Sequence, residues 1–210
     1  DGDRIAFVTS QGEALSEERT ITLAAAIVLS QEPGTVVTNV STTRAVDEVA
    51  KRHGGTVVRT PVGQSFISEA MIEHRAVIGG EGNGGVAVPR VLLSHDAAAA
   101  QGLIIEHMAR TGASLAQLVG TLPVFAMVKH DFAEKPSALY SILQDFRDTI
   151  EREGIGADET DGIVVPFDDG WVHVRASQTE SMIRVIAEAA PAARARDLAD
   201  WARDRLGAGR

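Results

Sequence analysis

A strand–helix–strand pattern between residues 35 and 58 constrains the fold of this chain most strongly. Residues 35–40 are rich in β-branched side chains, which favour strands. A helical segment capped by Ser41 or Thr42 follows and ends at Gly54, and residues 56–58 resume as a second short strand. A connection of this length is typical of a crossover between parallel strands. The sequence therefore predicts an α/β domain that contains parallel strands.

Further periodic segments extend this domain. We expect helices over residues 13–29, with Ser16 as N-cap, 65–74, and 97–110, the last capped by Asp96. A short helix should begin at Ser114. We expect strands over residues 5–8 and 76–78, and an edge strand or irregular segment over 86–93 because that segment contains Pro89. Pro33 and Gly34 stop the first helix and favour a domain boundary there.

The sequence from residue 123 onward predicts a different, α+β arrangement. Residues 125–129 form a strand, 138–153 an amphipathic helix, and 163–172 a hairpin with its turn at residues 168–170. A further strand begins at residue 182, and a helix over 192–206 covers the sheet. With a second boundary between Leu122 and Val124, the predicted domains are 1–33, 34–122 and 123–210.

Composition narrows the class of protein. The 210 residues are 44% hydrophobic and 23% charged, as in globular proteins, and the apolar runs are shorter than the ~20 residues that a membrane helix needs. A net charge of −9 disfavours nucleic acid as a partner. The chain has no cysteine, which excludes disulfides and thiolate metal sites. We expect a cytoplasmic protein with no membrane or nucleic-acid partner, and the sequence predicts no oligomeric state.

A polar loop between two apolar strands is the first candidate site. It carries Arg175, Ser177, Gln178 and Thr179, and Arg184 follows in the second strand. A guanidinium fork with hydroxyls and an amide suits a phosphate group, because charge-assisted bidentate bonds are strong. The alternative is an ordinary polar turn between two strands.

A glycine-rich stretch over residues 79–85 is the second candidate site. Five of its seven residues are glycine, which allows positive φ angles and close approach of the backbone to a ligand. Glu81 and Asn83 offer an acceptor and an amide to sugar hydroxyls. The spacing does not fit a dinucleotide fingerprint. The alternative is a flexible turn.

Carboxylates at the start of the chain are the third candidate site. Asp1 and Asp3 flank a glycine beside the expected strand 5–8. Such oxygen ligands suit Mg²⁺, which usually takes only part of its shell from protein. The alternative is a solvated turn.

These motifs, in this order, resemble those of the α-D-phosphohexomutases, the superfamily of phosphoglucomutase, phosphomannomutase and phosphoglucosamine mutase. Residues 175–184 resemble its phosphate-binding loop, and residues 80–84 its sugar-specificity loop. Residues 1–4 resemble the end of its metal loop, in which Asp1 and Asp3 match two of three aspartates. Arg4 then becomes the candidate catalytic residue of this chain.

The resemblance also gives a role to the turn at residues 59–63, where Thr60 and Gly63 are expected to face the substrate. Some members place a histidine after this glycine, but Gln64 stands here and cannot carry a proton. The family usually has proline at the positions of Ala176 and Ser181.

The family likeness implies a fold and an activity. The expected fold is α/β: a mixed-sheet sugar-phosphate-binding domain followed by an α+β phosphate-binding domain. The expected activity is reversible phosphoryl transfer between the 1- and 6-positions of a hexose, through a phosphoserine and a hexose bisphosphate, with Mg²⁺ as cofactor. Hexose phosphate and bisphosphate would be the ligands.

Two departures from the family limit this expectation. The serine loop and the first aspartate of the metal loop have no counterpart in this sequence, so we expect a fragment that lacks the N-terminal domains and is inactive alone. One alternative is a non-catalytic sugar-phosphate-binding module or degenerate paralogue. Another is a structural or partner-binding α/β protein.

Overall fold

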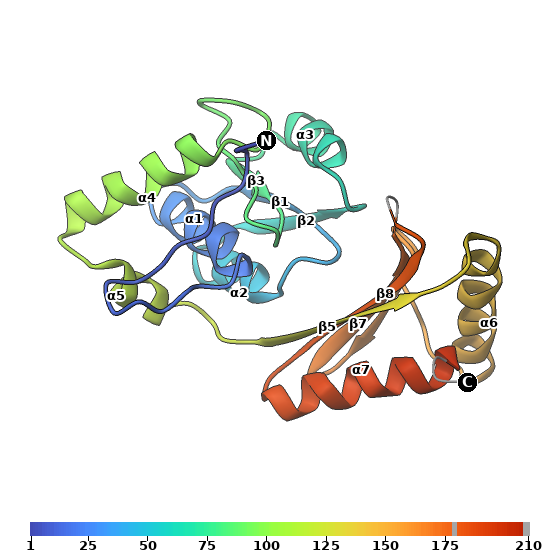
Figure 1. The fold of residues 1–210 in the computed structure, drawn as a ribbon. Coiled ribbons are helices and arrows are strands. Elements are labelled where there is room, and N and C mark those ends of the chain that lie inside the picture. Colours follow the sequence, from blue (N-terminus) through green and yellow to red (C-terminus); the bar gives the residue numbers. More distant parts are fainter. Residues whose placement is uncertain (178–179, 208–210) are drawn as a thin grey trace. The chain divides into compact units, whose positions relative to one another are not determined.

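The computed structural model describes residues 1–177 and 180–207, which divide into two compact units (Figure 1). The first unit is Asp1–Pro123 and the second is Val124–Arg210. The boundary expected near Leu122 therefore lies at the junction of the units, whereas the boundary expected after Pro33 falls inside the first. Each unit has its own hydrophobic core and is described by itself.

The first unit is built on a four-stranded sheet in the order β2-β1-β3-β4. The central strand β1 (Thr35–Asn39) pairs in parallel with β2 (Thr56–Thr60) and β3 (Ile78–Gly80), and β4 (Val86–Ala87) runs antiparallel to β3. Helix α2 (Ala45–Arg52) connects β1 to β2, as the strand–helix–strand pattern predicts. The parallel crossover is thus confirmed.

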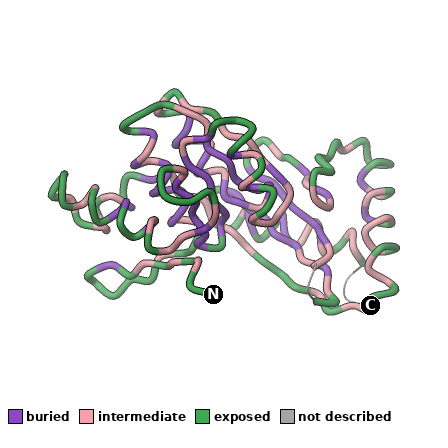
Figure 2. Tube along the Cα trace, turned by 90° about the horizontal axis from the view of Figure 1, so that it is seen from above, coloured by how far each residue is buried: buried purple, intermediate pink, exposed green. Residues whose placement is uncertain are grey.

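Helices cover both faces of this sheet. Helices α1 (Glu18–Leu29), α2, α4 (Ala97–Thr111) and α5 (Leu115–Gly120) contribute to one core, and α3 (Gln64–Glu73) contributes to the other. Adjacent residues of β1 face opposite ways, because Val36 belongs to the first core and Val37 to the second. A strand buried on both faces needs a continuous apolar run, which is why residues 36–37 do not alternate with polar residues. Figure 2 shows buried residues in the inner segments of the chain and exposed residues on the outer loops and helix faces.

Helix caps at two positions agree with the sequence. The Asp96 side chain accepts a hydrogen bond from the backbone N–H of Ala99 at the start of α4. Ser114 and Gln117 form a capping box at the start of α5. In both cases the side-chain acceptor satisfies an otherwise unpaired N–H of the first turn.

Several expected boundaries are wrong in the first unit. Residues 5–8 form no strand, since only isolated bridges join Arg4 to Gly85 and Val8 to Ala14. The Leu15 amide bonds to the Phe7 carbonyl in this folded-back segment, so α1 starts at Glu18 rather than at residue 13 and Ser16 is not its cap. Helix α2 likewise starts later, after Arg44, without a side-chain cap. Residues 86–93, expected as an edge strand or an irregular segment, form a strand only over the two residues of β4.

The second unit is an antiparallel sheet in the order β5-β8-β7-β6. Its strands are β5 (Ala126–Ala133), β6 (Ile163–Phe167), β7 (Gly170–Ala176) and β8 (Met182–Ala189). Helices α6 (Leu139–Arg152), preceded by the short η1 (Pro136–Ala138), and α7 (Ala192–Leu206) supply the covering side chains, and α7 lies along the sheet in Figure 1. Val172 and Val185 in the sheet pack in one core with Phe146 of α6 and Leu198 of α7. The predicted hairpin and covering helix are confirmed.

Among the described residues, no helix combines the length and apolar character that a bilayer-crossing segment requires.

Candidate functional site

Three strand ends of the first unit meet at one edge of its sheet. Asn39 ends β1, Thr60 ends β2 directly beside it, and Glu81 follows β3. The carboxyl ends of parallel strands lie at the same edge, which is where α/β sheets bind ligands. The glycine-rich stretch is therefore anchored at the edge where a ligand is expected.

The Glu81 carboxylate connects the loops at this edge. One of its oxygens, Oε1, accepts hydrogen bonds from Asn39 Nδ2 at 2.5 Å and from the Gly63 amide at 3.1 Å. The other oxygen, Oε2, accepts from Asn83 Nδ2 at 3.2 Å. Glu81 is only 4% exposed, so these bonds replace the water that a carboxylate needs. We call Asn39, Gly63, Glu81, Asn83 and His95 the Glu81 cluster.

Asn83 stands at the exposed tip of this cluster, while its neighbours are buried. Its side-chain oxygen accepts from the Gly85 amide at 2.9 Å, which closes the loop. Gly84 has a φ of 90°, and a Cβ there would lie 2.7 Å from the Ile5 carbonyl oxygen. Glycine is required at this position because the first residues of the chain pass so close, with the Ile5 amide bonding to the Gly84 carbonyl.

This contact brings the candidate metal motif beside the glycine-rich loop. Arg4 is exposed and bridges to Gly85, Asp3 is half-buried, and Asp1 is exposed. No group of three or more histidine, aspartate or glutamate side chains suited to a metal ion occurs in the described ranges. Asp1 and Asp3 therefore do not complete a Mg²⁺ site with the described residues.

His95 is a member of the cluster that sequence reasoning did not assign to a site. It is 6% exposed, and its Nε2 atom lies 3.7 Å from Glu81 Oε2 without forming a hydrogen bond. Burial lowers the pKa of His95, although the negative charges of Glu81 and Asp3 oppose this change. A Cβ on Gly85 would lie 2.2 Å from His95 Nδ1, so the imidazole ring occupies the space beside this glycine.

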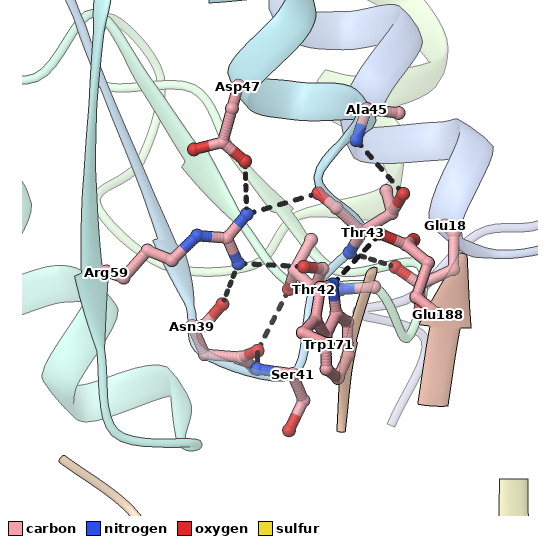
Figure 3. Close-up of polar contacts among 11 residues, drawn as sticks. Glu18, Asn39, Ser41, Thr42, Thr43, Ala45, Asp47, Arg59, Trp171 and Glu188 are labelled. Carbon is pink, nitrogen blue, oxygen red and sulfur yellow. Dashed lines mark hydrogen bonds and ion pairs between the residues drawn. The ribbon is translucent and has the colours of Figure 1, made fainter. Parts of the chain in front are cut away.

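Arg59 holds the loop between β1 and α2, next to Asn39 of the Glu81 cluster (Figure 3). Its Nη1 donates to the carbonyl oxygens of Asn39 and Thr42 at 2.9 and 2.7 Å, and its Nη2 pairs with Asp47 at 2.5 Å. Thr42 in turn accepts a hydrogen bond from the Gly82 amide at 3.0 Å. Arg59 therefore has a structural role, since both of its terminal nitrogens donate hydrogen bonds within the protein.

The two expected turn residues lie at the same edge. Thr60 is buried, and its hydroxyl donates to the Pro61 carbonyl at 2.8 Å. Gly63 is half-buried with a φ of 141° and is tied to Glu81 through its amide. The structure thus brings Thr60, Gly63, Glu81 and Asn83 together.

In the second unit, a row of charged side chains crosses the sheet. Asp131 of β5 lies opposite Arg184 of β8, which lies opposite Arg175 of β7, so all three share one face. Arg184 donates from Nε and Nη2 to the two Asp131 oxygens at 2.7 and 3.0 Å. The hydrogen bond with Arg184 lowers the pKa of Asp131, and the same bond raises the pKa of Arg184. We call these three residues with Asp161 the charged row.

Arg175 is in a different position from Arg184. It is 7% exposed, and its Nε atom lies 3.5 Å from Asp161 Oδ2, outside hydrogen-bond geometry. A buried guanidinium stays charged and keeps its other N–H donors. Arg175 is therefore the better placed of the two arginines to meet an anion.

The loop that follows β7 is described in part. The Ser177 amide bonds to the Met182 carbonyl at 2.9 Å, and the Ser177 hydroxyl oxygen accepts from the Glu180 amide at 3.2 Å. Gln178 and Thr179, which we expected to contact phosphate, lie outside the described residues. The two strands therefore bring Arg175 and Ser177 to the base of the expected phosphate loop.

Comparisons with known proteins show the family to which this chain belongs. Residues 16–125 match the sequence model of the alpha/beta/alpha domain III of phosphoglucomutase/phosphomannomutase, and residues 129–205 match the C-terminal domain of the same proteins. The chain belongs to the α-D-phosphohexomutase superfamily and corresponds to its C-terminal portion.

Individual relatives support the same assignment. A phosphoglucomutase/phosphomannomutase of Thermococcus kodakarensis is 36% identical over 94% of this chain and 43% of its own length. A probable phosphoglucosamine mutase of Methanopyrus kandleri is 35% identical over 95% of this chain and 44% of its own length. The crystal structure of a phosphoglucomutase/phosphomannomutase family protein from Burkholderia thailandensis superposes with a TM-score of 0.83 at 25% identity, covering 100% of this chain and 46% of that one. The chain thus spans less than half the length of these relatives.

Proposed function

We propose that this chain is the sugar-phosphate-binding portion of a phosphohexomutase. The reaction is reversible transfer of a phosphoryl group between the 1- and 6-positions of a hexose phosphate, through a phosphoserine and a bisphosphate intermediate. The hexose is glucose, mannose or glucosamine, the sugars of the mutase family. The observation that carries the proposal is Arg175, a buried cation at the base of the loop that resembles the family's phosphate-binding loop.

Arg175 supports phosphate binding on chemical grounds. Its guanidinium cannot lose its proton in a protein, so burial leaves a charge that needs a partner. The Asp161 carboxylate, 3.5 Å from Arg175 Nε, offsets part of that charge. This contact is made at Nε, so it does not use the two terminal nitrogens of the guanidinium. A phosphate oxygen pair matches such a planar fork. Arg175, with Ser177 beside it and Gln178 and Thr179 in the same loop, would hold the phosphate that is not reacting.

The Glu81 cluster supports recognition of the sugar. Glu81 is buried and bonded to three donors, so in this structure it fixes the loop rather than standing open to a hydroxyl. Asn83 is exposed at the tip of the loop. Its neighbours Gly82 and Gly84 have no side chains, so a ligand can approach the Asn83 amide group closely. We propose that Asn83 contacts the hexose hydroxyls, that Glu81 sets its orientation, and that Thr60 and Gly63 border the same site.

Asp1, Asp3 and Arg4 form the third part of the proposal. The two carboxylates would supply hard oxygen ligands to Mg²⁺. No third His, Asp or Glu side chain of the described residues joins them, so any further protein ligand would come from elsewhere. Arg4 is exposed beside the glycine-rich loop and would offset negative charge on a phosphoryl group.

A mutase assay tests the proposed function. Glucose 1-phosphate, mannose 1-phosphate and glucosamine 1-phosphate are offered, with and without Mg²⁺, to the 210-residue chain and to a full-length protein that contains it. We expect the full-length protein to convert at least one of them and the 210 residues alone to convert none, because they contain no counterpart of the phosphoserine loop. Turnover by the 210 residues would place the nucleophile within them. Absence of turnover by the full-length protein would favour a non-catalytic sugar-phosphate-binding module.

A further inference from the structure

Asp161 stands directly beside the arginine that the proposed function assigns to phosphate. Its Oδ2 atom lies 3.5 Å from Arg175 Nε, and the two side chains are 17% and 8% exposed. Arg175 Nε is buried and makes no hydrogen bond, so Asp161 contacts it as an ion pair. This ion pair joins Asp161 to the Nε edge of the guanidinium rather than to Nη1 or Nη2.

The backbone of Asp161 is held in place by β7. His173 lies two residues before Arg175 on the same face of the strand, and its Nε2 is 2.5 Å from the Asp161 carbonyl oxygen. A carbonyl oxygen only accepts, so Nε2 carries the proton of this bond. Burial lowers the pKa of His173 to about 4, so at neutral pH this histidine adds no positive charge beside Arg175.

Gly162 fixes the segment on the other side of Asp161. It has a φ of 65°, and a Cβ there would lie 2.5 Å from the Val174 carbonyl oxygen and 2.8 Å from Arg175 Cβ. The chain can lie this close to β7 only without a side chain at position 162. The backbone of residues 161–162 is therefore held against β7 at two points, the Asp161 carbonyl group and Gly162.

Arg184 provides the contrast within the charged row. Asp131 binds it through both Nε and Nη2, at 2.7 and 3.0 Å, and these side chains are 32% and 44% exposed. Asp131 therefore binds the Nε–Nη2 edge of the Arg184 guanidinium with both of its oxygens, and both side chains are partly accessible to water. The two aspartates thus have different relations to their arginines, although both neutralise charge in the same row.

We propose that Asp161 is a positioning residue that holds Arg175 by its Nε edge and leaves the two terminal nitrogens to bind a phosphate group. This inference rests on the proposed function, in which Arg175 binds phosphate. A carboxylate that only competed with the ligand would have the opposite effect, because its removal would raise the positive potential at the site and tighten anion binding. The sign of the change therefore decides between the two roles.

The test compares Asp161→Asn with Asp131→Asn, since each removes one negative charge next to one arginine of the row. Binding of inorganic phosphate and of glucose 6-phosphate to the 210-residue chain is measured by calorimetry, with Arg175→Ala as the reference for loss of the site. We expect Asp161→Asn to raise the dissociation constant of both ligands roughly tenfold, which is the effect of losing one charge-assisted contact. Asp131→Asn should leave them unchanged or slightly tighter.

Two further measurements separate positioning from general damage. The ¹⁵N–¹H signal of Arg175 Nε should shift in Asp161→Asn and not in Asp131→Asn. If Asp161→Asn does not fold, Asp161→Glu takes its place, because it keeps the charge but displaces the carboxylate by one methylene. It should then weaken phosphate binding while its melting temperature stays close to that of the wild type.

The outcomes test the positioning role of Asp161 separately from phosphate binding by Arg175. Equal or tighter phosphate binding by both aspartate variants, together with a large loss in Arg175→Ala, would overturn the role of Asp161 and leave the phosphate site standing. Unchanged binding in Arg175→Ala would overturn the phosphate site itself.

Discussion

Arg175 and Arg184 lie directly opposite each other on β7 and β8, and each is paired with its own aspartate. Like charges in this cross-strand position ordinarily destabilise a sheet. Here Asp161 and Asp131 stand at the two ends of the row and offset the repulsion. The arrangement fixes a cation, Arg175, in advance at the place where we propose that phosphate binds.

Arg184→Ala tests whether Arg184, the more exposed arginine of the charged row, stabilises the fold rather than binding phosphate. The variant loses the ion pair with Asp131 but also loses the repulsion of Arg175. Because both partners of the ion pair are partly exposed, we expect the free energy of unfolding to change by less than about 1 kcal/mol. Urea denaturation measures this change, and calorimetry with inorganic phosphate measures the site. A loss of phosphate affinity as large as that of Arg175→Ala would make Arg184 a direct ligand, as the family resemblance implies.

A double-mutant cycle tests the packing of His95 against Gly85. Gly85→Ala places a methyl group 2.2 Å from His95 Nδ1, which a buried ring cannot escape without displacing its neighbours. We expect a loss of roughly 1–3 kcal/mol in the free energy of unfolding. The same change in a His95→Ala background should cost much less, because the ring is gone. Additive losses would show that the two residues do not share this space.

His173 should make stability depend on pH. Its pKa is lowered from 6.5 to about 4, chiefly by burial, with the Asp161 hydrogen bond and the Asp161 and Asp158 charges opposing and Arg175 assisting. The unfolded chain therefore binds more protons than the folded chain between pH 6.5 and 4, so stability falls as pH decreases through this window. The loss attributable to His173 is on the order of 3 kcal/mol.

His173→Gln isolates this contribution, since an amide can still donate to the Asp161 carbonyl but does not titrate. Urea denaturation of both proteins at several pH values should give a shallower decline for the variant. Parallel curves would mean that other groups produce the pH dependence.

Much of the fold was predictable because local patterns agree with it. The β-branched run at residues 35–40, the helix after it and the polar loop after β7 each carry their own signal. The caps at Asp96 and Ser114 follow the same logic, since a side chain three residues from its partner N–H is a local feature. Residues 5–8 misled the prediction because their short apolar run folds back on residues 13–15 instead of joining the sheet.

The candidate sites were predictable in position but not in detail. The glycine-rich loop lies at the edge where the parallel strands end, yet Glu81 is buried because Asn39 and Gly63, distant in sequence, converge on it. Arg184 and Asp131 are separated by 53 residues, so only the strand register brings them together. Asn39 had one readable signal, its place at the end of a parallel strand. His95 had none, because its relation to Gly85 is steric.

The most direct measurement is a calorimetric comparison of glucose 6-phosphate with glucose, for the wild-type chain, Arg175→Ala and Arg175→Lys. If Arg175 binds phosphate, the alanine variant should lose far more affinity for the sugar phosphate than for the neutral sugar. The lysine variant should also bind the phosphate more weakly, because an ammonium group lacks the planar fork. Equal losses for the two ligands, or full retention of sugar-phosphate affinity in Arg175→Ala, would contradict the account.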